Sequence, residues 1–153
     1  MEKIVFVAFS HTLTQEQIED LSADKIILLS DVNADLAAQC RQIDPTLSSR
    51  SVMFIAGWVV LEALKADATH FVCQGEPALA MWANIIASGC STHSMMHEAS
   101  HDILYSHILE DRHLNGMTCI QSTTKRELVS EVQDNGKVIK KTVFKHVQWR
   151  ELF

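Results

Sequence analysis

Histidines and a glutamate gather in the segment HEASHDILYSH, residues 97–107, at a spacing that could bind a metal. His97, Glu98 and His101 follow the pattern His-Glu-x-x-His, in which one helix presents two zinc ligands and a glutamate as general base. His107 is a candidate for a third ligand beyond them. The spacing therefore raises the hypothesis of a small zinc-dependent hydrolase.

The surroundings of this pattern favour another interpretation. The longer zinc-protease pattern has a glycine at the position that turns the chain toward its third ligand, and this sequence has Leu104 there. On a continuous helix His107 would lie about 280° around the axis from His97, so its ring would be poorly aimed at a shared metal. We therefore interpret residues 90–115 as a helical insertion, with a helix over 97–114 that carries solvated histidines. The zinc hydrolase stays open as an alternative.

A second set of polar residues follows two predicted strands. The first strand ends at Ser10 and is followed by His11, and a later strand ends in Gln74-Gly75. The carboxyl ends of parallel strands meet at one edge of a sheet, where open α/β sheets bind ligands, so these residues should lie together. Gly75 would let the backbone approach a phosphate, to which Ser10 could donate, and His11 could transfer a proton.

The C-terminal part of the chain adds groups suited to phosphate oxygens. Thr123, Thr124 and Arg126 supply two hydroxyls and a planar cationic fork. In the last predicted strand, alternation places every second residue on one face, and one such set is polar apart from its first member. That set is Phe144, His146, Gln148 and Arg150. We expect it to project together, with His146 either a catalytic or a hydrogen-bonded structural residue.

The elements that position these residues follow from hydrophobic patterning. Continuous apolar runs predict strands buried on both faces, and apolar runs that follow capping residues predict helices packed on a sheet. Thr14 with Gln17 forms a capping-box pattern, and Pro77 suits the first turn of a helix. The predicted strands are 3–10, 25–31 and 69–76, with helices opening near 14, 31 or 33, 48 and 77, and an antiparallel hairpin over 117–152 that turns at 134–136.

These elements predict an α/β fold with a mostly parallel sheet and a C-terminal β-hairpin, since strands that alternate with helices form parallel pairs. At 153 residues the chain is expected to form a single domain, 1–153. The apolar run at the N-terminus is too short for a secretory signal or a membrane span, which predicts a cytoplasmic protein. The four cysteines show no C-x-x-C spacing, so neither disulfides nor a thiolate metal site are predicted.

Charge is unevenly distributed along the chain. The net charge of −6 argues against a protein that coats duplex nucleic acid. Residues 125–153, however, hold seven basic and four acidic residues, whereas residues 1–124 hold six basic and fifteen acidic ones. A basic C-terminal segment on an acidic body could meet a phosphate ligand locally, or could be a solvated hairpin.

Three stretches carry a resemblance to a known family. They are FSHTLTQEQIEDL (9–21), FVCQGEP (71–77) and STTKRELVSEV followed by a turn and KTVFKHVQWREL (122–152). In this order they resemble a small Csx-type family of CRISPR-associated accessory proteins. The resemblance covers about half of the chain, and the C-terminal block carries most of it.

The resemblance implies a Rossmann-like, three-layer fold and ring-nuclease activity. Such enzymes cleave cyclic oligoadenylate, most often cyclic tetra-adenylate, the second messenger of type III CRISPR defence, by attack of a ribose 2′-hydroxyl that needs no metal or cofactor. His11, Arg126 and His146 are then the catalytic candidates, and Ser10, Gln74, Gly75, Thr123, Thr124 and Arg150 the ligand-binding ones. A ligand with internal symmetry suits a two-fold homodimer. A non-catalytic sensor or sequestering protein for the same messenger is the alternative.

Overall fold

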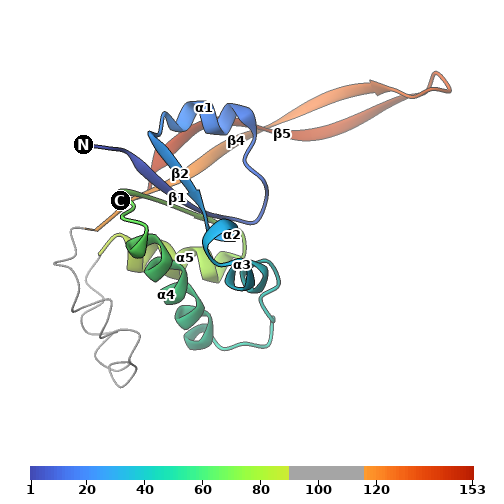
Figure 1. Ribbon diagram of the computed structural model, residues 1–153. Coiled ribbons are helices and arrows are strands. Elements are labelled where there is room, and N and C mark those ends of the chain that lie inside the picture. Colours follow the sequence, from blue (N-terminus) through green and yellow to red (C-terminus); the bar gives the residue numbers. More distant parts are fainter. Residues whose placement is uncertain (90–115) are drawn as a thin grey trace.

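A computed structural model describes residues 1–89 and 116–153 (Figure 1). The predicted insertion over 90–115, with its helix and its histidines, lies outside the described residues. Along the chain the elements are β1 (Ile4–Phe9), α1 (Gln15–Leu21), β2 (Lys25–Leu28), α2 (Leu29–Val32), α3 (Ala34–Arg41), α4 (Ser49–Lys65), β3 (His70–Gln74), α5 (Pro77–Ala87), β4 (Thr118–Val132) and β5 (Val138–Glu151). Within the described part, no helix is long and apolar enough to cross a membrane.

The strands form a five-stranded sheet in the order β2-β1-β3-β4-β5. β1 pairs in parallel with β2 and with β3, and β3 pairs in parallel with the start of β4. β5 returns antiparallel to β4. The prediction of an α/β fold with a mostly parallel sheet and a C-terminal antiparallel hairpin is therefore confirmed.

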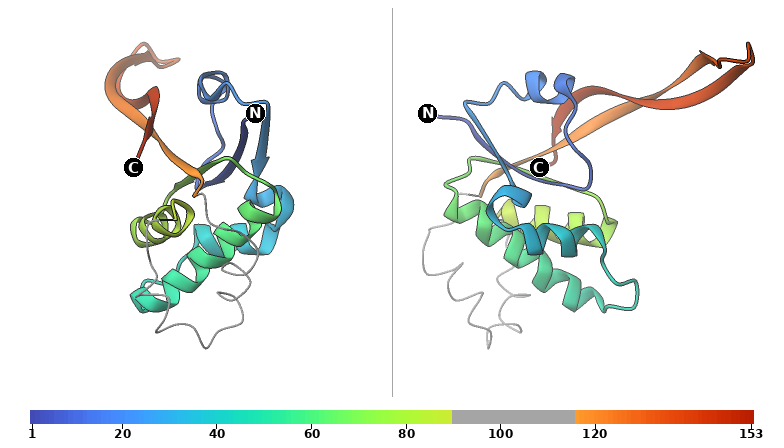
Figure 2. Two further views of the ribbon diagram at one scale, coloured as in Figure 1. Left: turned by 90° about the vertical axis from the view of Figure 1, so that its left-hand side faces the viewer. Right: turned by 45° about the vertical axis from the view of Figure 1, so that its right-hand side comes forward.

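Helices cover the sheet on both faces (Figure 2). On one face Phe6 stacks on Phe71, with ring centroids 6.2 Å apart, in the core shared with α2 to α5. On the other face Val7 and Val72 pack with Leu21 of α1. The central strands are buried on both faces, which explains why their sequences are continuous apolar runs rather than alternating ones.

Local capping signals set most helix starts as the sequence predicts. The Thr14 side chain accepts a hydrogen bond from the Gln17 N–H, and the Gln17 side chain accepts one from the Thr14 N–H, which completes the capping box. Asn33 and Ser48 cap α3 and α4. The second strand is shorter than predicted, because Leu29 begins a helical turn that buries its side chain in the core.

β4 and β5 run beyond the body of the protein as a long ribbon, which we call the arm and define as residues 125–145 (Figure 1). Its strands are joined by the predicted turn, where Gly136 has a φ of 78° and the Asn135 side chain accepts a hydrogen bond from the Lys137 N–H. The arm shares the sheet only through the strand segments at its base. The C-terminal hairpin is thus part sheet and part free projection.

Candidate functional site

A pocket of about 560 Å³ lies at the carboxyl ends of β1, β2 and β3. The chain leaves β1 toward α1 on one face of the sheet and leaves β3 toward α5 on the other, so the two loops diverge above neighbouring strands. Such a divergence creates a crevice at the edge of a parallel sheet. Ser10, His11, Gln74 and Gly75 all line this pocket. The structure therefore brings these four predicted site residues together.

The loops after β1 and β3 touch directly. The Ser10 N–H donates a hydrogen bond of 3.0 Å to the Gln74 carbonyl, which continues the strand pairing by one residue. Gly75 has a φ of 154°, and a Cβ at this position would lie 3.2 Å from the Ser10 Cβ. Both the backbone conformation and the close approach therefore require glycine here. This contact fixes the shape of the pocket rim.

His11 is the histidine of the rim. Its ring is exposed and lies edge-on to Phe9, with ring centroids 6.2 Å apart. Phe9 is half-buried at the end of β1 and gives the imidazole an apolar support on one side. The exposed ring could meet a ligand in the pocket and exchange a proton with it.

The wall of the pocket includes two cysteines that cannot act as nucleophiles at neutral pH. Burial raises the pKa of Cys40 to about 11 and that of Cys73 to about 12. Both thiols are therefore protonated under ordinary conditions, and only a thiolate is strongly nucleophilic. They behave as small apolar groups in the wall.

Charged residues of the pocket were not foreseen from the sequence. Asp31, Arg41 and Glu76 line it, so carboxylates outnumber cations. The Glu76 carboxylate accepts a 2.6 Å hydrogen bond from the Leu79 N–H and caps α5, so it occupies the N-terminus of that helix. Among residues 1–89 and 116–153, the groups that line the pocket are thus not predominantly cationic.

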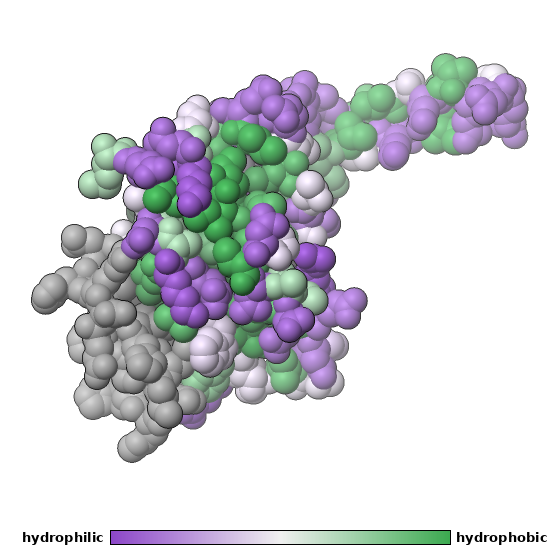
Figure 3. All heavy atoms as spheres, in the orientation of Figure 1, coloured by the Kyte–Doolittle hydropathy of each residue, from purple (hydrophilic) through white to green (hydrophobic). Residues whose placement is uncertain are grey.

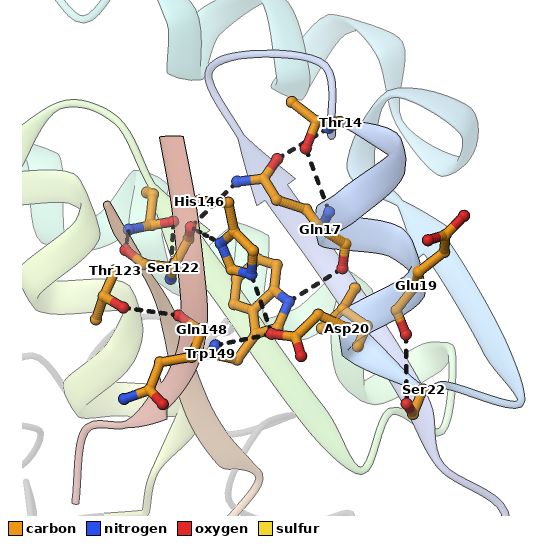
Figure 4. Close-up of polar contacts among 12 residues, drawn as sticks. Thr14, Gln17, Glu19, Asp20, Ser22, Ser122, Thr123, His146, Gln148 and Trp149 are labelled. Carbon is orange, nitrogen blue, oxygen red and sulfur yellow. Dashed lines mark hydrogen bonds and ion pairs between the residues drawn. The ribbon is translucent and has the colours of Figure 1, made fainter. Parts of the chain in front are cut away.

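A second polar cluster lies at the base of the arm, between β4, β5 and α1 (Figure 4). His146 is at its centre: its Nδ1 lies 2.7 Å from the Ser122 hydroxyl and its Nε2 lies 3.0 Å from the Asp20 carboxylate. The Gln17 side chain donates to the Ser122 hydroxyl over 3.1 Å. Asp20 also accepts the Trp149 N–H over 3.2 Å. We call Gln17, Asp20, Ser122, His146 and Trp149 the lock.

Every donor in the lock has an acceptor if His146 carries its proton on Nε2. Ser122 then accepts from Gln17 and donates to Nδ1, while Nε2 donates to Asp20. The residue types are those of a Ser-His-Asp hydrolase triad. However, Ser122 is only 7% exposed and the His146 side chain only 5%, so no substrate can reach either group in this conformation. The lock holds α1 against the hairpin.

The expected alternation along the last strand is wrong, because a β-bulge interrupts it. Thr123 pairs with Gln148 but Thr124 pairs with His146, which leaves Val147 as an extra residue in β5. Residues directly opposite in a ladder share a face, so His146 shares one face with Thr124 whereas Gln148 shares the other with Thr123. Arg150, opposite Gln121, also lies on the face away from His146. The predicted polar set is thus divided between two faces.

The remaining predicted residues lie along the hairpin and not in the pocket. The Thr123 hydroxyl donates to the Gln148 carbonyl over 3.0 Å. Arg126 places its guanidinium 5.4 Å from the centroid of the Phe144 ring, across the ribbon. None of Thr123, Thr124, Arg126, His146 and Arg150 lines the pocket described above. A single chain therefore separates the predicted site into two parts.

Gln74 connects these two parts. Its side-chain amide donates to the Ser122 carbonyl and accepts from the Ser122 N–H, both over 3.3 Å. These bonds extend the link between β3 and β4 beyond their last paired residues. Because both ends of the amide face β4, Gln74 joins the pocket rim to the lock through Ser122.

Among residues 1–89 and 116–153, no group of three or more histidine, cysteine, aspartate or glutamate residues could hold a metal ion. His97, Glu98, His101 and His107 lie outside the described residues. The zinc pattern therefore stays a hypothesis.

Together, the fold and the pocket define an α/β protein with a ligand-sized crevice at the carboxyl edge of a parallel sheet. A family model described as "Uncharacterized protein MJ1673 family" matches residues 101–150, less than half of the chain. In the described part, this match covers most of the C-terminal hairpin. No curated protein and no solved structure matches the chain.

Proposed function

We propose that this protein is a ring nuclease that binds cyclic oligoadenylate, in particular the cyclic tetramer, and cleaves it without metal. The observation that carries the proposal is the pocket at the diverging β1 and β3 loops, with Ser10, His11 and Gly75 at its rim. The strand order β2-β1-β3 with helices on both faces supports a Rossmann-like, three-layer fold. The resemblance of the Phe-Ser-His and Gln-Gly segments to the Csx-type family supports the choice of ligand.

The chemistry requires few groups. A ribose 2′-oxygen attacks the adjacent phosphorus, its proton passes to a base, and the 5′-oxygen leaves with a proton. Two such cleavages convert the tetramer into two linear di-adenylates, each ending in a 2′,3′-cyclic phosphate. His11 is the proton-transfer group, because its ring is exposed at the rim whereas His146 is enclosed. Arg126 stabilises the charge that develops on the phosphorane oxygens.

The remaining residues position the ligand. Ser10 and the Gly75 backbone contact phosphate, and Gln74 ties this rim to β4. His146 acts as a positioning residue, since it holds the hairpin base against α1. Thr123, Thr124, Arg126 and Arg150 lie away from the pocket of their own chain, so we propose that the active form is a homodimer in the cytoplasm that switches off type III CRISPR signalling.

The proposal is tested with labelled cyclic tetra-adenylate and an excess of chelator. Conversion to a di-adenylate 2′,3′-cyclic phosphate, detected by mass spectrometry, is the expected result. His11→Ala should bind the ligand and lose most of the conversion. Absence of both binding and conversion for cyclic rings of three to six adenylates would refute the proposal.

One observation favours a second function, a sensor that binds the messenger without cleaving it. In the described part of one chain, the pocket contains Arg41 as its single arginine or lysine, and the only histidine that lines it is His11. Stabilisation of a charged transition state needs more donors than that. Tight retention of the intact ring by the wild-type protein, with no product after many hours, would establish the sensor instead.

A further inference from the structure

The arm exposes apolar side chains on both faces, and the most exposed of them lie on one face. Residues directly opposite in the β4–β5 ladder share a face, which assigns Arg126, Leu128, Ser130, Val132, Val138, Lys140, Thr142 and Phe144 to the same face. We call this set the apolar face of the arm. Leu128 is 76% exposed, Val132 69%, Phe144 65% and Val138 60%. Figure 3 shows hydrophobic side chains among hydrophilic ones along the projecting ribbon.

The apolar face continues a face that is covered elsewhere. At the base of the hairpin, the same side of the ribbon carries His146 and Trp149, and α1 packs over both. Beyond α1 the apolar face extends for about 25 Å, at roughly 3.4 Å per residue, without a further layer from the described chain. A two-stranded ribbon in water is marginally stable unless its apolar face is covered. The arm is therefore built to pack against another surface.

The charges on the arm indicate what kind of surface can pack against its apolar face. The apolar face carries two charged residues, Arg126 and Lys140, and both are cations. Its acidic neighbours Glu127 and Glu131 lie on the opposite face, where Glu127 pairs with Lys125 over 2.8 Å. The body is acidic: residues 1–89 hold eleven acidic and five basic residues. Two arms packed face to face would bring four cations together, whereas an arm on a body pairs opposite charges.

The outer surface of α1 has the matching composition. Glu16 and Glu19 are exposed on this helix, and Ile18, which directly precedes Glu19, is 39% exposed and lines the pocket. An arm that covered Ile18 would bury apolar side chains on both partners and would place Lys140 or Arg126 beside carboxylates. Its cations would also lie next to the pocket, whose own lining is not cationic.

We infer that two copies of this chain exchange arms, so that the apolar face of each arm packs on α1 of the other copy beside its pocket. Reciprocal exchange about a two-fold axis covers the apolar face of both arms. Neither copy is then left with an uncovered arm or an unoccupied α1 surface. Each pocket then receives cations, including Arg126, from the second copy. This last step rests on the proposed function, whereas the exchange itself does not.

The exchange is tested first by sedimentation of the full chain. The wild-type protein is expected to be a dimer, and Leu128→Thr/Phe144→Thr should raise the dimer dissociation constant at least about tenfold, because central apolar contacts dominate interfaces. These residues are exposed, so thermal melting should show a folded protein. Trp58→Gln/Met81→Gln, which removes exposed apolar side chains from α4 and α5, is the matched control and should leave the dimer intact. A wild-type monomer at tens of micromolar, or dissociation in the control alone, would overturn the inference.

A charge exchange locates the docking surface. Lys140→Glu should weaken the dimer, as should Glu16→Lys/Glu19→Lys, and the chain that carries all three changes should recover most of the affinity. The differences in dimer affinity between these variants and the wild-type protein should become smaller at high salt. A tighter dimer for Lys140→Glu would show that the arms pack on each other and would refute docking on α1.

Ligand binding separates this inference from the proposed function. A dimer that depends on the arm but neither binds nor cleaves cyclic tetra-adenylate would refute the function and leave the exchange standing. Full cleavage by the monomeric Leu128→Thr/Phe144→Thr protein would refute the supply of cations from a second copy and leave the function standing. The expected result is loss of dimer and of cleavage together, with recovery of both at high protein concentration.

Discussion

The pocket rim and the lock both contain a serine and a histidine, but these residues differ in burial and in hydrogen bonding. At the rim, Ser10 and His11 lie beside an open crevice, and the His11 ring is exposed. In the lock, Ser122 and His146 are nearly completely buried, and both ring nitrogens have partners. A buried and fully hydrogen-bonded group stabilises the fold, whereas an exposed group with free capacity can meet a ligand. Burial and partners, rather than residue type, distinguish the two roles.

Replacement of the rim histidine should have the largest effect, and this effect should be on catalysis. His11→Ala should lower the rate of ring cleavage by about 10²–10⁴, the usual contribution of a general acid or base. Because the ring is exposed, the melting temperature should change little. Single-turnover cleavage and thermal melting measure the two quantities. A fall in stability with full cleavage would reverse the assignment.

Removal of the lock histidine should affect stability first. His146→Ala leaves Ser122 and Asp20 without their central partner and creates a cavity, so we expect a loss of about 2–4 kcal/mol in the free energy of unfolding. Urea denaturation measures this loss. Gln148→Ala, two residues away on the opposite face, is the control and should cost less than about 0.5 kcal/mol. Equal stability of both variants would show that the lock contributes nothing to the fold.

The contact that shapes the rim should be sensitive to a single methyl group. Gly75→Ala places a Cβ 3.2 Å from the Ser10 Cβ in an unfavourable conformation, and should destabilise the protein by about 1–3 kcal/mol. Gly136→Ala is the matched control, since its φ is also positive but no atom lies within 4 Å of the added Cβ. The difference between the two variants in denaturation gives the cost of the Ser10 contact together with that of the less favourable φ at Gly75. A larger loss of stability for Gly136→Ala than for Gly75→Ala would show that backbone strain, and not contact with Ser10, determines the cost.

The smallest expected effect concerns a third histidine, His70, whose burial is intermediate between that of His11 and that of the His146 side chain. His70 is half-buried, with its Nδ1 2.8 Å from the Thr69 hydroxyl, and burial, together with the positive charge of Lys3, lowers its pKa. The unfolded chain therefore binds the proton more tightly than the folded one. The stabilising contribution is complete above the ordinary pKa of 6.5 and is lost as pH falls from there through the folded pKa.

Urea denaturation between pH 5 and 8 should detect this loss. His70→Gln, which cannot titrate, should show a smaller fall in stability on acidification than the wild-type protein. A slope that is unchanged by the substitution would assign the pH dependence to other groups.

Much of the fold was accessible from the sequence, because it depends on local patterns. Runs such as KIVFVAFS predict strands buried on both faces, and the structure places β1 within that run. The capping box at Thr14 and the turn at Gly136 depend on side chains within three residues and on backbone conformations that few residues adopt. The position of His11 and Gly75 at one edge followed from the parallel pairing of their strands.

The division of the candidate site was decided only in three dimensions. His146 reaches Ser122 and Asp20, which lie 24 and 126 residues away in the chain, and no local spacing encodes these contacts. The bulge at Val147 also escaped prediction, because a ladder can absorb one extra residue without any change in hydrophobic pattern. Because of this extra residue, the later residues of β5 lie on the face opposite to the one that simple alternation predicts. Local sequence patterns thus specify which elements form and which residues end the strands, whereas contacts between distant segments enclose His146 and leave His11 exposed.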